Sequence, residues 1–148
     1  APLTFFIFYS LIGLSPSFAL PQDQPAQRLV NAKTLKCAFS LSMTVDWEKD
    51  IPKHKVSDSN MGIFFDAIDL DKKSARFIGN AGAEELWVID TEEGITFIEQ
   101  TPSGNHNFTT VFNHFNESLS GFVAVHSRHI NMLAPLPSQW HGICKVWD

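Results

Sequence analysis

Apolar and polar residues alternate along residues 35–45, the clearest pattern in the chain. Every second residue is apolar, and the residues between are small, polar or charged. A period of two is typical of a β-strand with one face buried and the other exposed. We therefore predict a strand over Leu35–Val45, with a core face made of Leu35, Cys37, Phe39, Leu41, Met43 and Val45.

Shorter runs of the same kind fill the rest of the chain, separated by turn residues. Seven further strands are predicted, at Gly62–Leu70, Ser74–Gly79, Glu85–Ile89, Ile95–Gln100, Asn107–Phe112, Gly121–His129 and Gly142–Trp147. Most links between them contain Gly, Asn, Asp or Pro, which favour tight reversals. The longest link, Trp47–Asn60, is polar and is expected to be an irregular, mobile loop. Pro25 suits a first helical turn, so a short helix from Pro25 to Asn31 is a candidate.

Eight short strands with short links predict an all-β antiparallel meander that is a closed or nearly closed barrel. A curved two-sheet sandwich is the alternative. Residues 1–19 precede this domain, residues 20–33 form a tail or short helix, and residues 34–148 are expected to form a single β-rich domain. Lipocalin-like ligand carriers share this architecture, but the glycine-x-tryptophan of their first strand is missing, since Trp47 follows Asp46 at the far end. We assign no family, because architecture alone does not carry function.

The first nineteen residues have the composition of a secretion signal. An uncharged apolar run at residues 3–14 is followed by Ser17-Phe18-Ala19, with small residues at the −3 and −1 positions of a cleavage site. No charged segment precedes the run, so we expect the sequence to begin partway through its precursor. An uncleaved membrane anchor is the alternative, but twelve residues rise only ~18 Å as a helix, against a hydrocarbon core of roughly 30 Å. We expect a secreted or periplasmic protein whose mature domain is not stably inserted in a membrane.

Cys37 and Cys144 are the two cysteines of the chain and lie near the two ends of the predicted β domain. An even cysteine count in an exported protein favours a disulfide. Such a bridge would join the first strand to the last and favours closure of the sheet. Two buried free thiols are the alternative.

The formal net charge of −5 argues against a nucleic-acid partner, because such binding needs clustered Lys and Arg. No catalytic motif is found, so catalytic residues stay unknown, and neither a metal site nor a cofactor is expected. Two triplets, Asn107-Phe108-Thr109 and Asn116-Glu117-Ser118, match glycosylation acceptors.

The densest polar group follows the apolar residues 122–125. In a strand His126 and Arg128 share one face, whereas His126 and His129 point to opposite faces and are not expected to bind one metal ion. Arg128 is suited to a bidentate contact with a carboxylate or phosphate. An exposed strand end with a surface ion pair is the alternative. Trp140 is expected to pack over one end of the barrel or to present a binding surface.

The residues therefore allow three functions. The preferred one is an exported, noncatalytic binding module for a small apolar ligand or a protein partner, with His126, Arg128, His129 and Trp140 as candidate contacts. The second is a hydrolase or lyase that uses His126, Arg128 and His129. The third is an accessory subunit of a membrane complex that retains the N-terminal segment.

Overall fold

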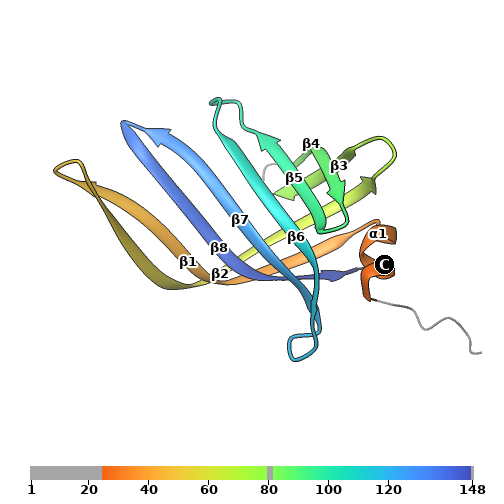
Figure 1. The fold of residues 1–148 in the computed structure, drawn as a ribbon. Coiled ribbons are helices and arrows are strands. Elements are labelled where there is room, and N and C mark those ends of the chain that lie inside the picture. The colour runs from red at the N-terminus through yellow and green to blue at the C-terminus, as the bar shows by residue number, and fades with distance from the viewer. Residues whose placement is uncertain (1–24, 80–81, 148) are drawn as a thin grey trace, which may run out of the picture.

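The computed structural model of the protein describes residues 25–79 and 82–147, which form one short helix and eight β-strands (Figure 1). The predicted signal segment, residues 1–19, lies outside these residues. No helix in the described part of the chain has the length and apolar character needed to cross a membrane. The elements are α1 (Pro25–Asn31), β1 (Leu35–Glu48), β2 (Ile51–Asp69), β3 (Ser74–Gly79), β4 (Gly82–Thr91), β5 (Gly94–Gln100), β6 (His106–Asn116), β7 (Gly121–Met132) and β8 (Ala134–Val146).

The strands form one antiparallel sheet in which each strand pairs with the next, and β8 pairs with β1 to close a barrel. This confirms the predicted meander and its closure, and no second sheet packs on the first among the described residues. Closure leaves no free edge along the paired part of the strands, which is the usual way for a small antiparallel sheet to protect its edges.

The core lies inside the barrel because inward-facing residues alternate with outward-facing ones along the strands. The predicted helix is present, and its Leu29 and Ala32 are buried in the same cluster while Val30 faces solvent. Because α1 also contacts β6, it covers one end of the interior (Figure 1). The largest fully buried aromatic side chains are Phe39, Phe65, Phe97 and Phe122.

Cys37 and Cys144 form a disulfide, as predicted. The two residues lie directly opposite each other in the β1–β8 pairing, and both side chains are buried. The covalent bond therefore lies across the seam at which the first and last strands close the barrel. Such a disulfide is typical of extracytoplasmic proteins.

The single core face predicted for Leu35–Val45 is wrong beyond Phe39. The pairing of β1 with both neighbours shifts between Phe39 and Leu41. Relative to β8 the extra residue is Ser40 of β1, which forms a bulge, whereas relative to β2 the extra residue lies on β2. A bulge adds one residue to a two-residue period, so it moves the following side chains to the opposite face. Leu41 and Met43 are accordingly 37% and 36% exposed, in contrast to the buried Leu35, Cys37 and Phe39.

The predicted loop at Trp47–Asn60 is also wrong, because most of it is the first half of β2. The reversal is a two-residue turn at Lys49 and Asp50, whose φ angles are +50° and +62°. Two successive positive φ angles are characteristic of a type I′ hairpin turn, which is usually marked by Asn-Gly or Asp-Gly. Since Lys-Asp is an unusual pair for this turn, the hairpin has no clear signal in the sequence.

The last strand starts earlier than predicted, at Ala134 rather than Gly142, and contains Pro135 and Pro137. Both prolines pair with β7, whereas the pairing of β8 with β1 begins only at Ser138. Proline has no N–H to donate, so it is tolerated where one side of the strand has no partner. The Trp47 side chain bridges this stretch by donating an indole N–H to the Pro135 carbonyl over 2.8 Å.

Candidate functional site

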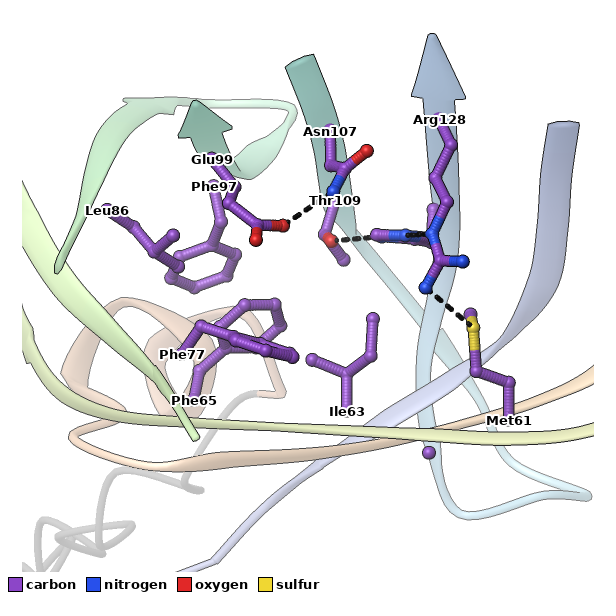
Figure 2. A pocket seen from close by; sticks show the side chains of 12 residues that line it. Met61, Ile63, Phe65, Phe77, Leu86, Phe97, Glu99, Asn107, Thr109 and Arg128 are labelled. Atoms are coloured by element: carbon purple, nitrogen blue, oxygen red, sulfur yellow. Dashed lines mark hydrogen bonds between the residues drawn. The ribbon is translucent and has the colours of Figure 1, made fainter. Parts of the chain in front are cut away.

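A cavity of about 150 Å³ lies inside the barrel, between β2 and the strands β3 to β7 (Figure 2). About half of its wall is apolar, and part of this apolar half is formed by the stacked rings of Phe65 and Phe97, whose centroids are 4.1 Å apart. The ring of Phe77 lies against Phe65 with the centroids 6.3 Å apart. The apolar lining residues are Met61, Ile63, Phe65, Phe77, Leu86 and Phe97.

Polar side chains from three adjacent strands form the rest of the cavity wall (Figure 2). They occupy inward positions of β5, β6 and β7. On β6 and on β7 the two polar residues are two positions apart, and the polar residue on β5 comes two positions after the apolar Phe97. Side chains at this spacing share a face, so the strand geometry gathers them on one side of the cavity. The polar lining residues are Glu99, Asn107, Thr109, His126 and Arg128.

His126 is the buried centre of this polar group, with 4% of its surface exposed. Its Nε2 atom accepts a hydrogen bond from the Arg128 Nε–H over 3.3 Å. The proton of a neutral imidazole must then lie on Nδ1, which donates to the Thr109 hydroxyl over 2.8 Å. Burial, and to a lesser extent the positive charge of Arg128, lower the pKa of His126 to about 4.

This lowered pKa predicts a pH dependence of stability between about pH 6.5 and 4. In that window the unfolded chain binds a proton at His126 and the native protein does not, so the free energy of unfolding falls as the pH falls. The slope contributed by this one group approaches about 1.4 kcal/mol per pH unit. Urea unfolding of the wild type and of His126→Asn at several pH values measures the difference, and parallel pH profiles would contradict the prediction.

Asn107 and Glu99 form a second polar pair at the cavity. They lie opposite each other on β6 and β5, and the Asn107 Nδ2–H donates to Glu99 Oε2 over 2.7 Å. Asn107 is 9% exposed, and within the described residues its Oδ1 atom has no hydrogen-bond partner. A buried acceptor without a donor is unfavourable by about 1–3 kcal/mol.

Sequence reasoning did not identify this pair. It interpreted Asn107 as part of a glycosylation triplet, but the side chain is buried inside the barrel, so a glycan on it is incompatible with the folded domain. Glu99 gave a usable signal, because it shares a face with Ile95 and Phe97 in its predicted strand. Asn107 and Thr109 gave none, because Phe108 and Phe112 indicated the opposite face of their strand as the core face, whereas Phe112 is 37% exposed in the structure. Polar residues on a core face usually have a structural or functional partner.

The structure brings three of the four predicted contact residues together. The Arg128 guanidinium lies 4.8 Å from the centre of the half-buried Trp140 ring, and the Trp140 and His126 rings are 5.6 Å apart. His126 and Arg128 share a face as predicted, and the alternative of an exposed strand end is wrong for the buried His126. His129 lies on the outer face of β7, where its exposed ring is 5.2 Å from that of Phe108.

Residues 25–79 and 82–147 contain no group of three or more His, Cys, Asp or Glu side chains placed to hold a metal ion. No family model, curated protein or solved structure matches the chain. The chemistry of the cavity is therefore the basis for the proposal that follows.

Proposed function

We propose that the protein is an exported, noncatalytic binding module that holds one small, mainly apolar ligand inside its barrel. The observation that carries the proposal is a cavity with an aromatic and aliphatic wall and a polar group on one side. Ligand sites commonly combine a mostly apolar lining with a few convergent polar groups. A comparable engineered cavity of about 150 Å³ admits benzene, so this cavity has room for a single six-membered ring.

The hydrogen bonds of His126 favour binding over catalysis. Because Nδ1 already carries the proton, the imidazole is unable to accept the proton of Thr109 and activate its oxygen as a nucleophile. The Arg128 N–H occupies the Nε2 lone pair that would otherwise act as a general base. His129, the third residue of the hydrolase or lyase alternative, faces the other side of the sheet.

Export is supported by two features that are independent of each other. Residues 1–19 have the composition of a secretion signal, and the chain carries a disulfide. Disulfides persist in oxidising compartments and are rare in the cytosol of most organisms. A secreted or periplasmic location therefore belongs to the proposal.

Thermal unfolding with 2-phenylethanol, a neutral single-ring probe, tests the proposal. A ligand that binds the native state raises the free energy of unfolding by about 1.4 kcal/mol at ten times its dissociation constant. We expect this stabilisation for the wild type and not for Leu86→Phe, in which a larger side chain fills the cavity. Ile63→Phe, on another part of the wall, provides a second filled cavity.

Trp87→Phe is the matched control, because Trp87 is the neighbour of Leu86 but faces outward and is 66% exposed. This variant should respond to the probe as the wild type does. Absence of stabilisation of the wild type by the probe would contradict the proposal. The proposal would also be contradicted if the probe stabilised the two filled variants as much as the wild type. Circular dichroism checks that these variants are folded.

A further inference from the structure

The Asn107 side chain is part of the cavity wall, and the orientation of its amide is set by Glu99. A carboxylate only accepts hydrogen bonds, so the amide group next to Glu99 must present its nitrogen to it, as the 2.7 Å contact shows. The carbonyl oxygen Oδ1 is then directed away from Glu99. Asn107 is more than nine-tenths buried, and no donor of the described residues reaches this oxygen.

Glu99 adds a negative charge beside this acceptor. Within the described residues its carboxylate receives one side-chain hydrogen bond, from Asn107, and no Lys or Arg lies within ion-pair distance of it. Glu99 therefore presents a carboxylate at the cavity wall, and the Asn107 amide holds that carboxylate in place. An ammonium group, with three N–H donors and a positive charge, is the complement of such a carboxylate.

Arg128 does not neutralise this negative charge, because its donors point elsewhere. Its Nε–H is bound to His126, one terminal nitrogen lies 3.9 Å from the Met61 sulfur, and its guanidinium covers the Trp140 ring. Figure 2 shows Arg128 and Glu99 on opposite sides of Thr109. The part of the cavity near Glu99 therefore favours a positively charged ligand group. The opposite side is itself positively charged because it holds the Arg128 guanidinium.

The apolar wall restricts the rest of the ligand. Phe97 lies two residues before Glu99 on the same face of β5, so the carboxylate and the aromatic wall are adjacent. A ligand with its amine at Glu99 can place an apolar ring against Phe65, Phe77 and Phe97. The cavity of about 150 Å³ limits this ring to a single one.

Resting on the proposed binding function, we infer that the ligand is a small aromatic amine, bound as its ammonium cation by Glu99 with its ring against the phenylalanine wall. Arg128, Thr109 and His126 form the opposite side of the site. This arrangement selects against carboxylate ligands at the Glu99 side, because a second carboxylate there would be repelled.

Isothermal titration with three probes of nearly equal size tests the inference at pH 7. The probes are 2-phenylethylamine, 2-phenylethanol and 3-phenylpropionate, which differ in the charge of the group at the end of the chain. We expect the amine to bind about tenfold more tightly than the alcohol, or better, since charge-assisted hydrogen bonds are about twice as strong as neutral ones.

Two variants test whether Glu99 causes the preference for the amine over the alcohol. Glu99→Gln should weaken binding of the amine by about tenfold and leave the affinity for the alcohol nearly unchanged, because the side chain keeps its shape and loses its charge. Glu85→Gln is the matched control, since this exposed glutamate faces outward on β4 and should change neither affinity.

Each remaining outcome is decisive. If 3-phenylpropionate binds best and Arg128→Gln removes its binding, the ligand is an anion and the inference is wrong while the binding function stands. If the affinities of the three probes agree within about threefold, the inference is also wrong, because the cavity then does not discriminate between ligands by their charge. If none of them binds, both the inference and the proposed function fail.

Discussion

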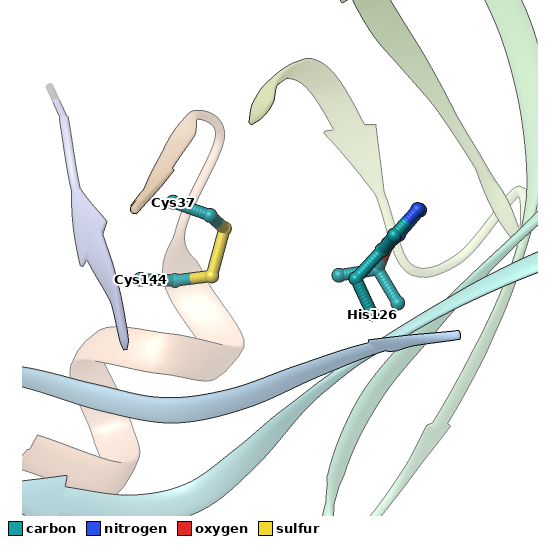
Figure 3. Close-up of a disulfide and its surroundings, with 4 residues drawn as sticks. Cys37, His126 and Cys144 are labelled. Carbon is teal, nitrogen blue, oxygen red and sulfur yellow. A yellow bond between two sulfur atoms is a disulfide. The ribbon is translucent and has the colours of Figure 1, made fainter. Parts of the chain in front are cut away.

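Loss of the Cys37–Cys144 disulfide is expected to lower the free energy of unfolding by about 4–5 kcal/mol. The bridge closes a loop with a sequence separation of 107 residues, and the chain-entropy model gives about 4.7 kcal/mol for loops of this length. The gain arises mainly in the unfolded state, which loses conformations when its ends are joined. Figure 3 shows the bridge between the two strands, separate from His126.

Urea unfolding of the oxidised and the reduced wild type isolates the crosslink, because both forms keep the same side chains. Cys37→Ala/Cys144→Ala should resemble the reduced protein, with a small further loss because both side chains are buried. A difference below about 1 kcal/mol between the oxidised and reduced wild type would mean that the unfolded chain is already restricted in other ways.

Gly142→Ala is expected to destabilise the protein by about 3 kcal/mol. At this position β8 passes so close to β1 that an added Cβ would overlap the Ala38 carbonyl oxygen and lie 2.6 Å from Phe39 Cα. Both obstructing atoms belong to the backbone, so a side-chain rotation does not relieve the overlap. The strands would have to separate at the seam, beside the bulge at Ser40.

Gly62→Ala is the matched control for this substitution. Gly62 pairs with Ala38 from the other side of β1, and its added Cβ would meet nothing closer than the Cys37 carbonyl oxygen at 3.7 Å. That distance is an ordinary contact, so the change in stability should stay within about 0.5 kcal/mol. Chemical denaturation of both variants measures the two changes in the free energy of unfolding. Equal losses of stability would show that the close approach of the backbone at Gly142 does not determine the cost of adding a side chain there.

The sequence predicted the eight strands and their order because each depends on local alternation. The predicted Cys37–Cys144 bridge was also correct, since an even cysteine count in an exported chain leaves few alternatives. The errors fall after the register shift in β1, at the hairpin that opens β2, and at the start of β8. There, pairing between strands decides the structure, and the turn at Lys49-Asp50 carries no strong local signal.

The candidate site was predicted in part. His126 and Arg128 were placed on one face because a period of two follows directly from strand geometry, and the structure adds Trp140 to them. Glu99 and Asn107 were missed because they lie on two strands whose relative register is not visible in the sequence. Their contact depends on that register.

The alternation of apolar and polar residues by itself determined that this chain forms antiparallel strands with one buried face, because side-chain direction in a strand has a fixed period. Only the tertiary structure decided how far the buried face of a strand continues along it. In β1, one bulge at Ser40 reverses the orientation of every residue that follows. It alone also decided that Glu99 meets Asn107 and that His126 meets Thr109. Those pairs depend on cross-strand register, which is set by closing the whole barrel and not by any single segment.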